Sequence, residues 1–469
     1  MRRWILPSAT LVALTTVSSA HADEPRTLFG HEVFDPPEPG AEELQRRRDS
    51  FQQHLRDNDL VFTGDRIMPR SQALGHRPNP QHGGTGGWED PPHYATIFLN
   101  FFGGTLTSGT NAAEMESNCV GAASVDYPAY SGTQGDALAI IQVFENAMEP
   151  YAVRVAYEDP PPQHLPYSMV MMGGSPSDVG QDQGTLGVSC SSDCGDVWWR
   201  DTTLAFTEES GNPTTLGNTA LQEAAHAFGL DHIDGTEHIM YPLATPGNKI
   251  WSSACTPYNN STGPIGCTYV HEVFCPEGSQ NDDAELLAFF GPNAPDVEAP
   301  TVMILSPSDG IEVDSGGAVT VDAEISDDHE GYGWRLRVVP PEGDEVIANA
   351  YQLETGWDLS FNGLPDGEYE VWVEAVDHDG NEGSDMIRVF VGVPATDTGS
   401  VDDSGGGGGR GSDEGVGTGS GGDATGDGTT APADGGDGGG GGGCRTAPIR
   451  PAWWSLLGLL VLVRRRERA

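Results

Sequence analysis

The protein has 469 residues, which is long enough for two or three domains of about 150 residues each. Its 70 acidic residues outnumber 23 basic residues, and the formal net charge of −47 repels phosphate backbones, so nucleic-acid binding is excluded. Of the 64 glycines, 22 lie between Pro394 and Cys444, so the glycine excess belongs to one segment and the remaining chain has a globular composition.

Residues 1–22 have the pattern of a secretory signal peptide. Two arginines near the start precede an apolar run, and the small-x-small sequence Ala20-His21-Ala22 follows it. No cysteine comes directly after the run, so lipidation is not expected at this end. The sequence therefore predicts export.

Residues 23–90 are rich in proline, arginine and acidic side chains, with one helix expected over residues 41–55. This segment could be a propeptide or a linker. It contains no cysteine, so a thiol latch of the kind that some secreted proteases use is not available to it.

Residues 91–295 alternate between strand and helix patterns. Short apolar runs that end at turn residues predict strands, and apolar positions at helical spacing predict helices. The order of strand, helix, strands and helix predicts a mixed α/β layer. Strands are expected over residues 96–102, 152–157, 167–172 and 203–207, and helices over residues 136–148 and 219–228.

Six of the seven cysteines fall within this same region. An even number of cysteines in an exported domain predicts three disulfides, whose pairing the spacing leaves open. A thiolate zinc cluster is the rival interpretation, but the pair with three intervening residues has no partner pair at a similar spacing. The six are Cys119, Cys190, Cys194, Cys255, Cys267 and Cys275.

The residues that carry chemistry lie at the end of the second expected helix. Gln222 and His226 are four residues apart and share one helix face, and Glu223 is adjacent to that face, where it could act on a water. Gly229 allows the chain to leave the helix through a left-handed turn, which would return His232 to the same point. Three side chains and one open position would make a catalytic zinc site with a carboxylate as general base.

This segment resembles the signature H-E-x-x-H-x-x-G-x-x-H of the metzincins, the secreted zinc endopeptidases that include the matrixins and astacins. The resemblance to the metzincins extends beyond this segment and covers about 200 residues. It implies an α/β metzincin-like domain with a mixed sheet and an active-site helix. It makes Glu223 the general base, His226 and His232 zinc ligands, Gly229 the turn glycine and Met240 the methionine of the Met-turn.

The first ligand position departs from the signature, because Gln222 stands where a histidine is expected. Three outcomes are open. Zn²⁺ could bind through Gln222, His226 and His232 with lowered affinity, since an amide oxygen is a weaker donor than imidazole. Another histidine, His238 or His271, could complete the site. Alternatively, the domain has lost catalysis and kept its fold.

Structural Ca²⁺ is the second metal to consider. The resemblance to matrixin-like domains implies that Asp178 and Asp182 could hold it, although both could equally be ordinary aspartates of an exposed turn. A third acidic segment, residues 377–381, could also suggest calcium. Its position between two expected strands favours a hairpin turn instead.

Residues 298–393 contain six or seven short strand patterns separated by turn residues, which predicts an all-β immunoglobulin-like sandwich. The module has no cysteine and resembles bacterial surface immunoglobulin-like modules more than antibody domains. Strands are expected over residues 301–305, 319–325, 334–339, 357–361, 369–376 and 386–391.

The end of the chain is expected to anchor it. Residues 394–443 have almost no apolar content and should form a disordered, flexible Gly/Asp-rich stalk. In residues 444–469, Cys444 precedes a short apolar run and an arginine cluster. This resembles the myxobacterial C-terminal sorting signal, which implies cleavage near Cys444 and attachment at the cell surface or outer membrane through it.

The sequence therefore predicts an exported, surface-anchored zinc endopeptidase that acts on proteins or peptides and contacts the membrane only through its C-terminal tag. The alternative is a catalytically inactive adhesin or scaffold that keeps the metzincin fold, because the first ligand position is Gln222.

Overall fold

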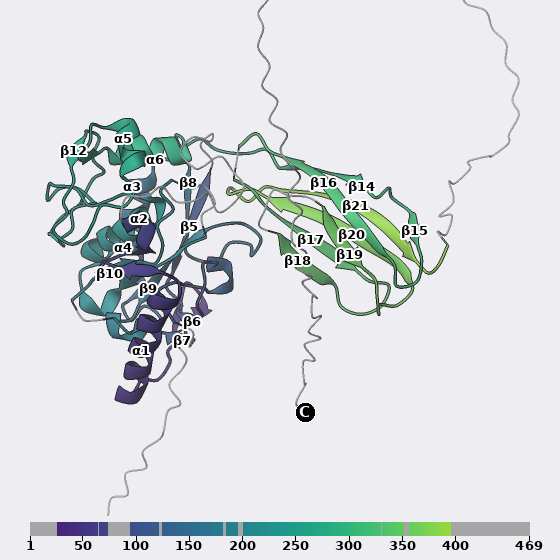
Figure 1. Ribbon diagram of the computed structural model, residues 1–469, viewed down its shortest axis with the longest axis horizontal. Helices are drawn as coiled ribbons and strands as arrows, with labels where there is room; N and C mark the ends of the chain where they lie inside the picture. The colour runs from purple at the N-terminus through teal and green to yellow at the C-terminus, as the bar shows by residue number, and fades with distance from the viewer. Residues whose placement is uncertain are drawn as a thin grey trace, which may run out of the picture. The chain divides into compact units, whose positions relative to one another are not determined.

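The computed structural model describes residues 26–394, with gaps at 64, 74–93, 122–123, 182–183, 196–199, 330 and 351–355. The predicted signal peptide, the stalk beyond residue 394 and the tag with Cys444 lie outside the described residues. Among the residues described, no helix has both the length and the apolar character that a membrane span requires. A mixed α/β region with several sheets is followed by a β-rich region (Figure 1).

A five-stranded sheet in the order β10-β11-β9-β5-β8 forms the centre of the α/β region. Its strands run parallel except for β10, an edge strand that is antiparallel to β11. Ile97 and Leu99 belong to one hydrophobic core and Phe98 to the other, as the alternation of side chains along a doubly covered strand requires. The strands are β5 (Ala95–Asn100), β8 (Val153–Ala156), β9 (Ser168–Gly173), β10 (Gly187–Ser189) and β11 (Thr202–Phe206).

Helices cover both faces of this sheet. Phe144 of α3 and Leu221 of α4 share the core of Ile97, whereas Phe51 of α1 packs in the core of Phe98. Gly217 allows α3 and α4 to approach closely, because a Cβ atom there would lie 2.8 Å from Cβ of Val143. The helices are α1 (Ala41–Asp57), α2 (Arg70–Ala73), α3 (Gln134–Met148), α4 (Pro213–Phe228), α5 (Thr268–Phe274) and α6 (Asp282–Phe290).

The predicted mixed α/β layer is confirmed, including a strand or helix at each expected position from residue 96 to 228 and the helix expected over residues 41–55. Helix α4 begins earlier than expected, at Pro213, because Asn212 caps it by accepting a hydrogen bond from the amide of Thr215 at 3.0 Å. Strand β10 was not predicted, since three residues are too few to show a pattern.

Short elements complete the α/β region. In the described part of this region, four two-stranded ribbons join segments outside the central sheet. They are β1 (Thr27–Leu28) with β2 (His31–Glu32), β3 (Leu60–Phe62) with β4 (Ile67–Pro69), β6 (Gly104–Leu106) with β7 (Val125–Tyr127), and β12 (Thr256–Pro257) with β13 (Ser279–Gln280). The 3₁₀ turns are η2 (Ala112–Glu114), η3 (Pro176–Val179) and η4 (Thr207–Glu209).

All six cysteines of this region are paired, so the prediction of three disulfides is confirmed and the rival thiolate zinc cluster is wrong. Because disulfides persist in oxidising compartments, they indicate an extracellular or otherwise oxidising environment. The pairs are Cys119–Cys190, Cys194–Cys267 and Cys255–Cys275.

The β-rich region consists of a three-stranded sheet, β14-β16-β19, and a five-stranded sheet, β15-β21-β20-β17-β18. Val321 from the first sheet and Trp334 and Val371 from the second belong to a single hydrophobic core, so the two sheets face one another. The strands are β14 (Thr301–Ser306), β15 (Ile311–Val313), β16 (Ala318–Ser326), β17 (Gly333–Val339), β18 (Val346–Ala350), β19 (Trp357–Ser360), β20 (Gly367–Val376) and β21 (Glu382–Val391).

Candidate metal centre

Helix α4 ends at Gly229 in a left-handed turn with a φ of 110°. The amide of Gly229 donates to the carbonyls of Ala225 and His226, which closes the helix. A Cβ atom at this position would lie 2.6 Å from Cα of Cys194, so both the backbone conformation and the close approach require glycine. The turn directs the following residues back towards the helix.

As a result, His226 and His232 meet in the interior, with their Nε2 atoms 3.0 Å apart. Nδ1 of His226 lies 2.7 Å from the carbonyl oxygen of Leu230, which can only accept, so Nδ1 is the donor. Nδ1 of His232 lies 2.9 Å from the hydroxyl of Thr262. The Nε2 atom of His226 therefore presents a lone pair, and the Nε2 atom of His232 presents one to the same point when the Thr262 hydroxyl accepts from its Nδ1.

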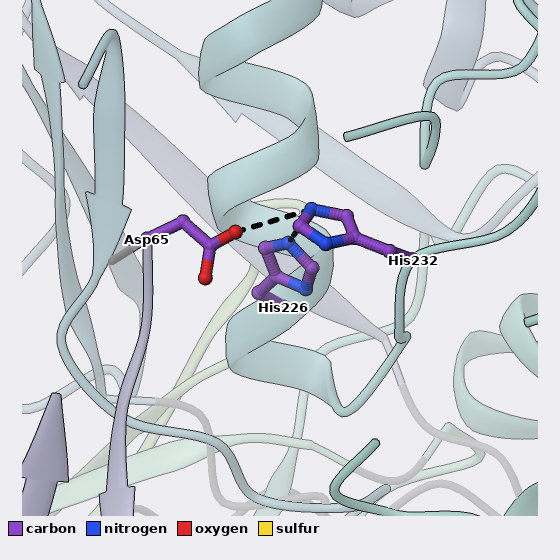
Figure 2. Close-up of side chains that lie close together, drawn as sticks. All are labelled: Asp65, His226 and His232. Carbon is purple, nitrogen blue, oxygen red and sulfur yellow. Dashed lines mark hydrogen bonds and ion pairs between the residues drawn. The ribbon is translucent and has the colours of Figure 1, made fainter. Parts of the chain in front are cut away.

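Asp65 brings a carboxylate to this pair of imidazoles. Its Oδ2 lies 3.4 Å from Nε2 of His232, and Figure 2 shows the three side chains directed towards one another beside α4. The ligand atoms of Asp65, His226 and His232 all lie within 4.8 Å of one another. No local spacing in the sequence indicates Asp65, because it is far upstream of both histidines.

The backbone of the Asp65 segment is held against the edge strand β10. Arg66 forms a parallel β-bridge with Ser189, and the amide of Ser189 donates to the carbonyl of Asp65 at 2.8 Å. The next residues, Ile67 and Met68, are buried. This segment is therefore integral to the packing around the site.

The donor set fits a metal ion. Burial and the nearby Arg66 lower the pKa of His226 well below its usual range, and burial lowers the pKa of His232 to about 4. Both imidazoles are therefore neutral, which is the form that binds metals. Two lone pairs and a carboxylate facing one point are stabilised by a cation there, so this buried group could hold a metal ion.

Glu223 lies on the same helix, one turn before His226. It is 2% exposed, and its Oε2 has no hydrogen-bond partner among the described residues. Burial and the neighbouring carboxylate of Asp65 raise the pKa of Glu223 well above its usual range. Glu223 is thus a buried carboxylate with one oxygen outside any hydrogen bond, next to a group that could hold a metal. Such a carboxylate is suited to act as a general base.

The other candidate ligands have contacts of their own. The side-chain amide of Gln222 donates to the carbonyls of Ile239 and Tyr241 at 2.9 and 2.8 Å. His238 is outside the ligand group, with Nε2 3.8 Å from a carboxylate oxygen of Glu237. His271 is fully buried between two carboxylates, and it is therefore not free to complete the site. 

Met240 is buried in the core beside the histidine segment, and its carbonyl accepts a hydrogen bond from the amide of Ile233 at 3.0 Å. Of the two aspartates considered for calcium, Asp178 is paired with Arg47 at 3.7 Å and accepts a hydrogen bond from the amide of Ser175. Asp182 lies outside the described residues.

A cleft of about 400 Å³ opens beside Glu223 and Asp65. Residues 184–187, which lead into β10, line one part of this cleft, and residues 241–245, which follow Met240, line another part. An edge strand next to a cleft can pair with an extended peptide through its backbone.

A buried chain of basic and acidic side chains lies next to the histidine segment. Arg66 pairs with Asp231, the residue before His232, and Asp231 lies 2.9 Å from Nε2 of His271. Burial opposes ionisation of Asp231, but the Arg66 and His271 interactions outweigh it and hold its pKa well below the usual range. Nδ1 of His271 lies 2.7 Å from Glu285. These pairs fix the segment that carries His232.

We expect the stability of the protein to fall between neutral and alkaline pH because of His271. Although burial opposes the charged form, Glu285 and Asp231 raise the pKa of His271 from 6.5 to about 9. The contribution of charged His271 to the free energy of unfolding is fully present below pH 6.5 and is lost as the pH rises through about 9. The raised pKa corresponds to a contribution of about 3 kcal/mol. Urea unfolding from pH 6 to 9.5 should show this loss in the wild type.

The variant His271→Gln should lack that pH-dependent loss, although it will be less stable at every pH. The histidine resonances in NMR give the pKa of the wild type directly. A pKa for His271 near its ordinary value would contradict the charged pair.

Neither a model of a known protein family nor a curated protein sequence matches this chain. Among solved structures, the fibronectin(III)-like modules of CbhA from Clostridium thermocellum match at 17% identity and a TM-score of 0.16, over 20% of this chain and 47% of that one. This chain thus spans about half the length of that structure. OgpA from Akkermansia muciniphila matches at 12% identity and a TM-score of 0.19, over 68% of this chain and 97% of that one. Likenesses at these TM-scores carry no argument about fold or function.

Proposed function

We propose that the protein is a zinc-dependent endopeptidase whose metal is held by Asp65, His226 and His232. The observation that carries this proposal is the convergence of two neutral imidazoles and one carboxylate on a single buried point. Two histidines and a carboxylate are a common ligand set of catalytic zinc, and three protein ligands leave the fourth tetrahedral position open. The resemblance of residues 222–232 to the metzincin signature supports the same assignment.

In this proposal Asp65 supplies the ligand that the sequence lacks at position 222. The amide nitrogen of Gln222 is engaged with two carbonyls, so its side chain is held by the loop of Met240. A carboxylate is a stronger ligand than a neutral amide for a divalent cation. The burial of Ile67 and the ion pair of Arg66 with Asp231 support a permanent role for the Asp65 segment.

When bound, Zn²⁺ would supply Lewis acidity at the carbonyl of the peptide bond and would favour ionisation of a water at neutral pH. Glu223 would take the proton of the attacking water and deliver it to the leaving amine. The edge strand β10, which lines the cleft at Gly187, would align an extended peptide along it. Thr262, by accepting from Nδ1 of His232, would keep that imidazole in the ligating tautomer.

The finer architecture belongs to the same proposal. The α/β region with its active-site helix would be a metzincin-like domain, and the two facing sheets after residue 300 would be an immunoglobulin-like module. The signal peptide, the stalk and the tag with Cys444 would export the enzyme and anchor it at the cell surface, where proteins or peptides are its substrates.

We expect Glu223→Gln to abolish proteolysis without loss of the metal. The substitution keeps the shape of the side chain but removes the base, and general-base catalysis contributes about 10²–10⁴-fold. The measurements are metal content by mass spectrometry and cleavage of an unfolded protein by the full chain. Glu237→Gln is the matched control, because Glu237 is an exposed glutamate in the loop near the cleft.

Two results would overturn the enzyme assignment. One is the absence of bound metal in wild-type protein saturated with Zn²⁺. The other is a wild type that binds metal and is as inert as Glu223→Gln, which would favour an adhesin or scaffold that has kept the fold.

A further inference from the structure

Three chain segments bring aspartates together beside the start of the β-rich region. Asp296 belongs to the segment that precedes β14, Asp327 to the loop between β16 and β17, and Asp377 to the turn between β20 and β21. One carboxylate oxygen of each lies within 4.8 Å of those of the other two.

The turn after β20 provides a rigid side of this cluster. Oδ1 of Asp377 accepts hydrogen bonds from the amides of Gly380 and Asn381, and its Oδ2 accepts from the side-chain amide of Asn381. The predicted hairpin turn is thus confirmed. Asp377 is 2% exposed, so its charge is held away from water.

The same turn holds the backbone of Asp296. The amide of Asp296 donates to Oδ2 of Asp379 at 2.8 Å, and its carbonyl accepts from the side chain of Asn381 at 3.3 Å. Oδ1 of Asp296 accepts from the amide of Glu298 at 3.1 Å. Every polar group of Asp296 except Oδ2 therefore has a hydrogen-bond partner.

The remaining oxygen of Asp296 points to a missing ligand. Its side chain is only 1% exposed, and Oδ2 makes no hydrogen bond within the described ranges. Nδ1 of His329 lies 3.0 Å from this oxygen and is an ion-pair partner for it, but neither atom makes a hydrogen bond among the described residues. Oδ2 of Asp327 is likewise buried without a hydrogen bond among these residues.

The electrostatics of the cluster agree with this geometry. Burial and the carboxylate of Asp377 raise the pKa of Asp296, despite the opposing hydrogen bond from Glu298. Burial and the carboxylates of Asp296 and Asp377 raise the pKa of Asp327 to about 6. Buried carboxylates at this separation repel one another, and a divalent cation between them would remove the repulsion.

We propose that Asp296, Asp327 and Asp377 bind a Ca²⁺ ion that ties the segment before β14 to the loops of the β-rich region. Calcium takes oxygen ligands at about 2.3–2.6 Å, so two ligands of one ion are at most roughly 5 Å apart. One oxygen of each of these three aspartates lies within 4.8 Å of the others, so all three can reach one ion. Carboxylate oxygens are hard donors, which select Ca²⁺ over metals that prefer imidazole. Water and backbone carbonyls would complete the six to eight positions that calcium prefers.

The test is calcium binding by the full chain, measured by isothermal titration and by equilibrium dialysis with radioactive Ca²⁺. Asp296→Asn can keep the hydrogen bond from the amide of Glu298 to Oδ1, and it removes the negative charge at Oδ2, the oxygen that accepts no hydrogen bond. We expect this variant to bind one Ca²⁺ ion fewer than the wild type, or to bind that ion at least tenfold more weakly. Asp344→Asn, which changes an exposed aspartate of the same region, should bind as the wild type does.

Calcium should also raise the unfolding temperature of the wild type and of Asp344→Asn more than that of Asp296→Asn, since it stabilises only a state with the site formed. Asp327→Asn tests the same site from another loop and covers the case in which Asp296→Asn does not fold. Equal calcium binding by the wild type and both cluster variants would overturn the proposal. The proposal would also be overturned if the protein bound Zn²⁺ but not Ca²⁺ and if His329→Gln lost that Zn²⁺ binding. Because no readout involves proteolysis, these outcomes are independent of the proposed enzymatic activity.

Discussion

Replacing His226 or His232 by alanine should remove stoichiometric metal from the protein and with it all proteolysis. Each imidazole supplies one of three ligand atoms in a buried group, and no other histidine belongs to that group among the described residues. Loss of an outer hydrogen-bond partner costs a metal site roughly 10–100-fold in affinity, so loss of a ligand should cost more. Metal content after dialysis, titration with Zn²⁺ and cleavage of an unfolded substrate measure the effect.

His238→Ala is the matched control for these variants. His238 lines the cleft beside Glu223 and Asp65 but is not part of the ligand group, so its variant should keep the metal. His226 is fully buried, and His226→Gln provides a variant of similar volume if the alanine protein is unstable. Full metal content in both the His226 and the His232 variants would show that the metal binds elsewhere.

Asp65→Asn should weaken Zn²⁺ binding by at least about tenfold and reduce proteolysis in parallel. The substitution keeps the side-chain shape and the backbone pairing with Ser189, and it removes only the charge that faces the two imidazoles. Metal affinity and the rate of proteolysis at saturating Zn²⁺ should be measured separately. Asp59→Asn is the control, because Asp59 pairs with Arg70 at an exposed position of the same segment.

The second variant, Asp65→Asn combined with Gln222→His, examines whether Asp65 replaces the missing first ligand. An imidazole at position 222 should restore part of the lost affinity, because Gln222 lines the cleft on the helix that carries His226. The opposite outcome for Asp65→Asn alone is higher activity with unchanged metal content. It would mean that Asp65 blocks the site rather than builds it, as a propeptide would.

The elements that the sequence predicted are those with enough residues to show a period. Strand β5 is buried on both faces and appears as an apolar run, and α3 shows helical spacing before Pro150. Strand β10 has three residues and therefore no detectable pattern, although it forms the edge next to the cleft. Disulfide formation was predictable from the number of cysteines, but their pairing depends on which loops the sheet brings together.

Within the candidate metal centre, the meeting of His226 and His232 depends on a helix and a single turn. Their spacing and the glycine between them are local features, so they could be recognised without knowledge of the fold. The role of Gln222 remained open, because its spacing on the helix does not reveal that its amide donates to the loop carbonyls.

The sequence by itself determined the export pattern, the order of strands and helices, and the histidine pair with its neighbouring Glu223, because each depends on residues close together in the chain. Only the tertiary structure decided that Asp65 faces the histidines and that Asp296, Asp327 and Asp377 meet. The physical reason is that these contacts join separate segments. Pairing of residues 65–66 with β10 positions the first carboxylate, and the turn after β20 holds the backbone of Asp296.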